Sequence, residues 1–140
     1  MSGVLGPSAY LLDTNILIEA IRGRASELED LFVRHEHELA TSSIVLAELE
    51  YGALNSSSPE RSQGAVAAWL GRMAVLDFDA QAAQQAAGVR HRLKCAGTPI
   101  GAYDVQIAGH ALATGCTLVT NNVRHFSRVE GLIVADWLNS

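Results

Sequence analysis

Several residue types are scarce in this chain of 140 residues, and each scarcity narrows the class of protein. Lysine occurs once, at Lys94, and the two cysteines, Cys95 and Cys116, lack the spacing of a metal site and indicate reduced thiols. No apolar run reaches the roughly 18 residues of a transmembrane helix. The stretch from Met1 to Val4 lacks the basic and apolar regions of a signal peptide. We therefore expect a cytoplasmic protein with no membrane segment.

The composition that remains is that of a globular protein. Hydrophobic residues make up 49% of the chain, enough for a core in one domain spanning residues 1–140. The net charge of -5 argues against a nucleic-acid binder, because neutralising phosphates requires Lys and Arg. An acidic site would, however, lower the net charge without preventing RNA binding elsewhere. The sequence contains two basic clusters, and each can be either a solvated face or an RNA contact. The first comprises Arg90, His91, Arg92 and Lys94, and the second comprises Arg124, His125 and Arg128.

Short apolar segments alternate with longer helix-like segments along the chain. The expected strands are residues 10–12, 38–41, 74–78, 116–120 and 132–135. The expected helices are residues 14–21, 26–35, 43–54, 59–72, 80–95 and 103–114. Strands separated by one or two helices require crossover connections and therefore a parallel sheet. The pattern predicts an α/β fold, a three-layer α/β/α sandwich around a central parallel sheet of four to five strands.

Polar residues follow the predicted strands at the edge where such sheets bind ligands. Asp13 ends the first strand, and Asn121 and Asn122 follow the fourth. Asp104 lies in the first turn of its helix, and Glu48 lies on the helix that follows the second strand. If the helices return over the sheet in the usual way, these side chains can converge at one edge.

A cluster of carboxylates at this edge would be repulsive unless a cation neutralised it. Hard oxygen ligands, with no His or Cys nearby, suit Mg²⁺ or Mn²⁺ rather than Zn²⁺. Such an ion activates water and stabilises charge on a phosphoryl group. The residues therefore indicate phosphodiester hydrolysis.

Each of these residues also has an ordinary structural interpretation. Asp13 can be a helix N-cap, Asp104 can interact with a helix dipole, and Asn121-Asn122 can form a turn. Glu48 and Glu50 share a helix, and periodicity does not say which of them faces inward. No single residue identifies the site.

Four blocks that carry these residues run in order along nearly the whole chain. They are Leu11-Leu12-Asp13-Thr14-Asn15-Ile16-Leu17-Ile18, Ser43-Ile44-Val45-Leu46-Ala47-Glu48-Leu49, Ile100-Gly101 with Asp104 and His110-Ala111, and Leu118-Val119-Thr120-Asn121-Asn122 with Arg124 and Phe126. Together they resemble the motifs of PIN-domain nucleases. The pattern is most similar to the toxin ribonucleases of VapBC-type toxin–antitoxin pairs.

The resemblance implies a role for each acidic residue. Asp13 and Asp104 would be the principal ligands of Mg²⁺, with Mn²⁺ as the alternative. Glu48 would complete the triad, by ligation directly or through water, or by orienting the attacking water.

PIN domains often carry a further acidic residue after the fourth strand, where this chain has Asn121-Asn122. Which of the two takes its place, and whether one or two metal ions bind, stay open. An amide oxygen can hold a metal or a water but brings no charge. Thr120 and Asn122 are the candidates for this supporting role.

The resemblance also implies an activity and partners. We expect a magnesium-dependent endoribonuclease that is the toxin of a toxin–antitoxin pair. Its antitoxin would insert a basic residue into the acidic site and lay an apolar helix near residues 16–21 and 45–54. A symmetric homodimer is expected as well. The alternative is a catalytically weak PIN scaffold that binds RNA or protein without cutting, and the RNA itself is not identified.

Overall fold

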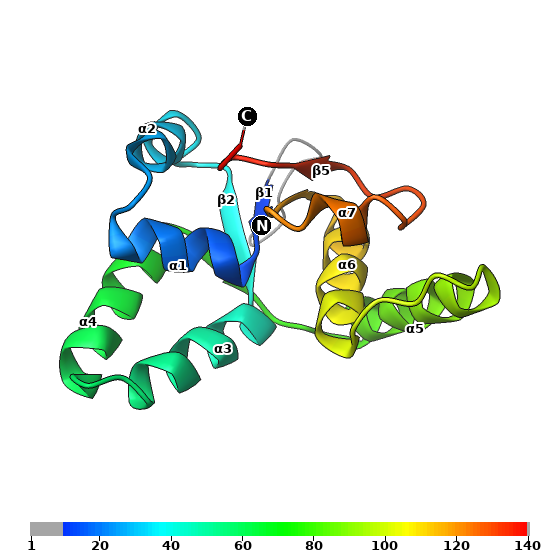
Figure 1. Cartoon of the computed structure of the whole chain (residues 1–140), viewed down its shortest axis with the longest axis horizontal. Helices are drawn as coiled ribbons and strands as arrows, with labels where there is room; N and C mark the ends of the chain where they lie inside the picture. The colour runs from blue at the N-terminus through cyan, green and yellow to red at the C-terminus, as the bar shows by residue number, and fades with distance from the viewer. Residues whose placement is uncertain (1–9, 140) are drawn as a thin grey trace.

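Five short parallel strands form the centre of the fold (Figure 1). The computed structural model describes residues 10–139, so the predicted lack of a signal peptide at Met1–Val4 lies outside the described residues. The strand order is β3-β2-β1-β4-β5. The strands are β1 (Tyr10–Leu12), β2 (Leu39–Ser42), β3 (Ala74–Leu76), β4 (Thr117–Val119) and β5 (Val134–Ala135). The predicted parallel sheet of an α/β fold is confirmed.

Helices flank the sheet on both sides, with α1, α3 and α4 on one side of β1 and β2 and with α6 and α7 on the other (Figure 1). The helices are α1 (Thr14–Arg22), α2 (Ser26–Arg34), α3 (Ser43–Leu54), α4 (Pro59–Leu70), α5 (Ala80–Cys95), α6 (Ala102–Thr114) and α7 (Val123–Phe126). Gly23 and Gly115 end α1 and α6 at φ values of 67° and 72°, a conformation that other residues rarely adopt. In the part of the chain that is described, no helix is long and apolar enough to cross a membrane.

The structure corrects several predicted boundaries. The strand predicted over residues 74–78 ends at Leu76, because Phe78 lies beyond the sheet and donates its backbone N–H to Ser43 Oγ at 3.0 Å. The second strand is shifted by one residue and ends at Ser42, which pairs with Leu76. Helix α7 was not predicted, because a helix of 4 residues is too short to show a periodic pattern.

The register of the central strand sets the position of the functional edge. Leu12 pairs with Thr41 of β2 and with Val119 of β4. The next residues along these three strands, Asp13, Ser42 and Thr120, therefore lie side by side at the carboxyl edge. Leu11 and Leu12 are both 0% exposed, as expected for a strand covered on both faces.

Helices α5 and α6 approach each other closely at Gly109. A Cβ atom at this position would lie 2.4 Å from the backbone nitrogen of Ala86 and 2.5 Å from its Cα atom. Both are backbone atoms, so the helices themselves would have to move apart. The contact fixes the position of α6, which carries Asp104.

We expect Gly109→Ala to destabilise the fold by about 1–3 kcal/mol, because the backbone clash outweighs the better helix propensity of alanine. The matched control is Gly64→Ala in α4, where an added Cβ meets nothing within 4 Å. This control should be neutral or stabilise by up to about 1 kcal/mol. Urea unfolding of both variants tests the prediction, and a Gly109→Ala protein as stable as the Gly64→Ala protein would contradict it.

Candidate active site

Asp13 lies at the carboxyl end of β1 and is 5% exposed. Its Oδ1 atom accepts a hydrogen bond from the Thr14 backbone N–H at 2.8 Å, so Asp13 is the N-cap of α1. Its Oδ2 atom accepts a hydrogen bond from Thr120 Oγ1 at 2.9 Å. The cap interpretation is therefore correct, and it is compatible with a site, because the same contacts fix the carboxylate in one orientation.

The environment of Asp13 disfavours its negative charge. Burial raises the pKa of Asp13, and the hydrogen bonds from Thr120 and Thr14 offset this only in part. The charge of Asp104 raises the pKa of Asp13 further. Two carboxylates close together in a partly dry environment are stabilised by a cation, which removes both penalties.

Thr120 and Asn122 connect the two carboxylates. The Thr120 hydroxyl donates to Asp13 and accepts the Asn122 backbone N–H at 3.0 Å. The Asn122 side-chain amide donates from Nδ2 to Asp104 Oδ2 at 3.4 Å. The structure thus brings together Asp13, Asp104, Thr120 and Asn122, whereas Asn121 is exposed.

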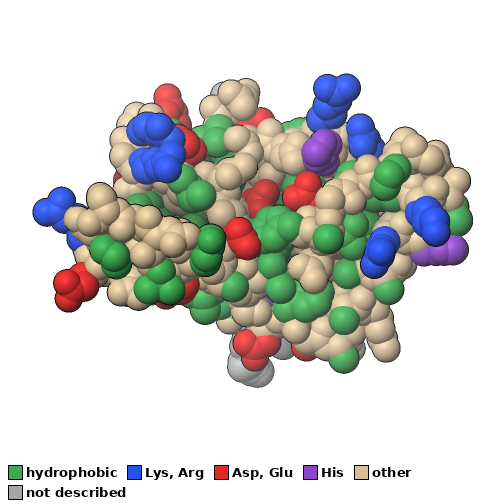
Figure 2. Space-filling model, turned by 60° about the horizontal axis from the view of Figure 1, so that its bottom comes forward, with side chains coloured by type: hydrophobic (Ala, Val, Ile, Leu, Met, Phe, Trp, Pro, Cys, Tyr) green, Lys and Arg blue, Asp and Glu red, His purple; other side chains and the backbone are tan. Residues whose placement is uncertain are grey.

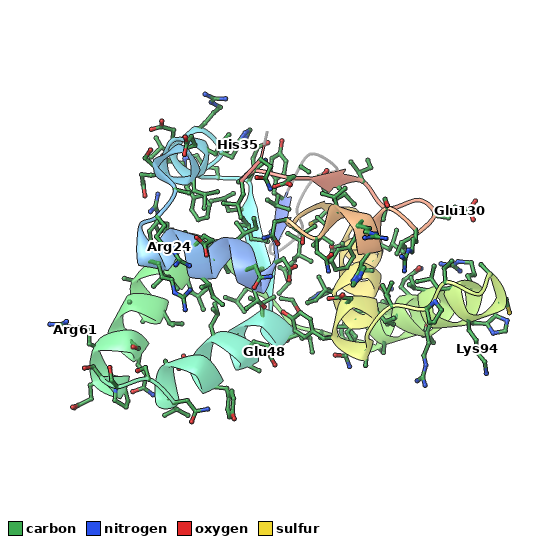
Figure 3. The ribbon with its side chains drawn as sticks, in the orientation of Figure 1. Arg24, His35, Glu48, Arg61, Lys94 and Glu130 are labelled. Atoms are coloured by element: carbon green, nitrogen blue, oxygen red, sulfur yellow. The ribbon has the colours of Figure 1, made fainter. Side chains whose placement is uncertain are left out.

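Glu48 is an exposed residue on α3 (Figure 3). It is close enough to raise the pKa of Tyr103 by its charge, as Asp13 and Asp104 also do. Among the described residues, no group of three or more His, Cys, Asp or Glu side chains could hold a metal ion as placed. The three acids therefore all lie near Tyr103, but as placed they do not form one group of metal ligands.

Sequence reasoning missed Tyr103. Its hydroxyl forms a hydrogen bond with Thr14 Oγ1. Burial raises the pKa of Tyr103, and the three surrounding carboxylates raise it further. The tyrosine is therefore a neutral hydroxyl close to the acids, and its position directly before Asp104 was the only signal in the sequence.

His125 was counted in a basic cluster, and the expectation that no histidine lies near the carboxylates is wrong. Its Nδ1 atom lies 3.3 Å from Asp104 Oδ2 and 3.0 Å from Asn122 Nδ2. The residue lies on α7, the helix that was not predicted, so the sequence did not show where its side chain would be.

A buried histidine joins the two helices that carry Asp104 and Glu48. His110 of α6 is 1% exposed, and its Nδ1 atom lies 2.8 Å from Ser42 Oγ. The same Ser42 oxygen accepts the Ile44 backbone N–H at 3.0 Å and caps α3. Burial lowers the pKa of His110, so a neutral imidazole holds the start of α3 against α6.

Acidic side chains lie near the middle of the face shown in Figure 2, and basic side chains lie toward both sides of it. This face combines a carboxylate centre with flanking positive charge. Basic side chains beside an acidic centre are compatible with binding of a phosphate backbone on one side of that centre.

Comparisons with known proteins agree with this geometry. A model of the PIN domain family matches residues 10–132. The chain is 41% identical over 128 residues to the tRNA(fMet)-specific endonuclease VapC of Salmonella typhimurium, covering 91% of this chain and 97% of the relative. It is 38% identical over 129 residues to ribonuclease VapC2 of Haemophilus influenzae, covering 92% of this chain and 98% of the relative.

The crystal structure of DNA-bound VapBC from Salmonella typhimurium has a similar fold. The TM-score is 0.89 at 41% identity, and the match covers 93% of this chain and 98% of the other. The resemblance seen in the four sequence blocks is confirmed. The chain belongs to the PIN-domain family and, within that family, to the VapC ribonucleases of toxin–antitoxin pairs.

Proposed function

We propose that this chain cuts RNA at the site formed by Asp13 and Asp104, with a divalent ion, Mg²⁺ or Mn²⁺. The observation that carries the proposal is the buried Asp13 carboxylate, whose pKa is raised by burial and by the neighbouring Asp104. Both of its oxygens are oriented by hydrogen bonds at the carboxyl edge of the sheet. PIN-domain ribonucleases are generally dependent on divalent metals, and this donor set suits a hard cation.

Each residue of the site has a proposed task. A bound divalent ion supplies positive charge that lowers the pKa of water and stabilises a phosphoryl group in displacement. Asp13 and Asp104 would hold it, while Thr120 and Asn122 keep the two carboxylates in place. Glu48 is exposed on α3, and it would orient the attacking water and accept its proton.

The proposed substrate is a structured RNA, with transfer RNA as the first to test. The relatives from Salmonella typhimurium and Shigella flexneri are named tRNA(fMet)-specific endonucleases. Arg90 and Lys94 of α5 line a groove of about 640 Å³, which Ala102 and Val105 of α6 line as well. Ala102 and Val105 lie in the first turn of α6, which also carries Asp104, so RNA phosphates bound along this groove would lie within reach of the turn that carries Asp104.

The proposed partner is an antitoxin that blocks the acidic centre with a basic residue. Solved relatives from Salmonella typhimurium and Rickettsia felis are VapBC complexes. An inserted Arg or Lys among Asp13, Glu48 and Asp104 would neutralise the charge that the metal otherwise neutralises. On α3, Tyr51 and Leu54 are 66% and 60% exposed and offer apolar surface for a partner helix.

The expected apolar surface of α1 is smaller than predicted. Ile16 and Leu17 are 0% exposed and belong to the core, so only the outer part of this helix can meet a partner. A symmetric homodimer and a cytoplasmic location stay part of the proposal.

The first prediction from the proposed function concerns Asp13→Asn. Incubation of the purified chain with total RNA, with and without Mg²⁺ and followed by mapping of the cut ends, should show metal-dependent cleavage that the variant lacks. The variant should be as stable as the wild type or more stable without metal, because asparagine keeps the cap and removes an unfavourable charge. The matched control is Asp30→Asn on the exposed face of α2, which should cut normally.

The same variant shows how Asp13 affects the pH dependence of stability. Because the pKa of Asp13 is raised in the fold, protonating it stabilises the folded state. The wild-type apo-protein should therefore gain stability over the variant as the pH falls through the raised pKa toward its ordinary value of 3.8. A variant that melts several degrees lower and still cuts RNA would show that Asp13 is only a helix cap, and a wild type that binds RNA without cutting would indicate the scaffold alternative.

The second prediction concerns the basic residues of α5. Replacing Arg90, Arg92 and Lys94 by Gln should weaken RNA binding and reduce its logarithmic salt dependence by about one unit for each phosphate that the variant no longer binds. Binding is measured in the Asp13→Asn background, so that the RNA stays intact. The control replaces Arg22, Arg34 and Arg61, and Figure 3 shows Arg61 on the opposite side of the molecule from Lys94. Equal salt slopes in both triple variants would make the α5 cluster an ordinary solvated face.

The third prediction concerns the antitoxin. A partner recovered with the chain from its native host should inhibit cleavage, and replacing the basic residues of its tail should abolish inhibition while retaining part of the binding. The retained part is the apolar contact, which Leu54→Asp on α3 should weaken. If the chain is recovered alone, active and harmless when overproduced, the toxin assignment is wrong while the ribonuclease assignment stands.

A further inference from the structure

Three polar atoms form a small triangle beside Asp13. Asn122 Nδ2 lies 3.0 Å from His125 Nδ1 and 3.4 Å from Asp104 Oδ2, and His125 Nδ1 lies 3.3 Å from the same Asp104 oxygen. Neighbouring ligands of an octahedral ion with bonds of about 2.1 Å lie about 3 Å apart. The three atoms are therefore spaced as one face of an octahedral ligand set.

The triangle cannot be satisfied by hydrogen bonds alone. The carboxylate only accepts, an amide group offers either donors or an acceptor, and His125 Nδ1 does one or the other. Suppose that the Asn122 amide donates from Nδ2. If His125 Nδ1 carries a proton, two donors face each other. If it does not, its lone pair faces the lone pairs of the Asp104 carboxylate. With the amide turned, so that its oxygen occupies the Nδ2 position, Asn122 and Asp104 face each other as acceptors. Every assignment leaves one mismatched contact.

A cation removes this mismatch. With the Asn122 amide turned, all three groups present lone pairs: a carboxylate oxygen, an amide oxygen and an imidazole nitrogen. The local fold supports the arrangement, because Asn122 precedes α7 and His125 lies three residues later on the same helical face. Phe126, which is 0% exposed, anchors this helix in the core.

We propose that His125 and Asn122 join Asp104 in holding the metal ion, so that the centre prefers Mn²⁺ to Mg²⁺ more strongly than an all-oxygen site would. Imidazole is a good ligand for transition metals, whereas Mg²⁺ binds oxygen ligands and keeps its waters. The proposal rests on the proposed function, since it assigns the ion of the same site.

The test compares binding of Mn²⁺ and Mg²⁺ to the full chain, by electron paramagnetic resonance of free Mn²⁺ and by competition with Mg²⁺. His125→Gln should weaken Mn²⁺ binding about tenfold and change Mg²⁺ binding by less than about twofold. Pulsed resonance of bound Mn²⁺ should show coupling to an imidazole nitrogen in the wild type, and this coupling should be absent from the variant. The matched control, His37→Gln at an exposed position between α2 and β2, should change neither.

A second variant, His125→Glu, should change metal binding in the opposite direction. His125→Glu replaces the nitrogen by a charged oxygen ligand, so it should strengthen Mg²⁺ binding and reduce the preference for Mn²⁺. Without metal, the unfolding midpoint of His125→Gln should match the wild type, because the His125 side chain is 43% exposed. The midpoint of His125→Glu should be lower without metal and should recover when Mg²⁺ binds, because its carboxylate lies beside that of Asp104.

The outcomes separate this inference from the proposed function. If Asp13→Asn abolishes Mn²⁺ binding while His125→Gln leaves both the ion preference and the nitrogen coupling unchanged, the metal site stands and the role of His125 is wrong. If the wild-type chain binds neither ion, the proposed function and this inference are both overturned.

Discussion

A buried negative charge that the protein itself does not neutralise is the constraint on which the site depends. Asp13 is 5% exposed, and hydrogen bonds from Thr14 and Thr120 orient it without removing its charge. A neighbouring Arg or Lys would stabilise the carboxylate and leave it inert. Burial and Asp104 instead raise the pKa of Asp13, so the site favours any cation that can reach it. The metal ion and the basic residue of an antitoxin would compete to neutralise the same carboxylates.

Keeping this charge in place requires a rigid frame around it. The parallel register aligns Asp13 and Thr120 at one edge, and Leu11 and Leu12 anchor the central strand in the core. Asp104 depends on a different contact, because it is carried by α6, which packs closely on α5 at Gly109. The neutral His110 imidazole then ties α6 to the cap of α3. Small displacements of either helix would change the distances between the acids, so the packing far from the edge determines its chemistry.

The acids differ in solvent exposure, and this difference suits them to different roles. Asp13 is buried, so a cation would offset its charge, whereas Glu48 lies exposed to water on α3. Tyr103 stays protonated near them, because burial and the three carboxylates raise its pKa. Its hydroxyl, which is hydrogen-bonded to Thr14, therefore adds no charge to the site.

The sequence alone determined the α/β class, the parallel sheet and four of the residues that meet at its edge, because alternating apolar segments and helix signals are local properties. Asp13 and Asn122 could be placed since each follows a predicted strand, and Asp104 since it begins a helix. Thr120, the last residue of the fourth predicted strand, was added by the family resemblance. Their chemistry was assigned by the family resemblance, because no single residue identifies the reaction by itself.

Only the tertiary structure decided which neighbours complete the site. His125 lies on a helix of 4 residues, too short to leave a periodic signal, and Tyr103 becomes central only when α6 approaches α1. The distance of Glu48 from the other acids depends on how α3 packs against the sheet. This packing cannot be predicted from the periodicity of the helix sequence. Contacts between residues such as Thr14 and Tyr103, which are 89 positions apart, arise from packing, and packing is a property of the whole chain.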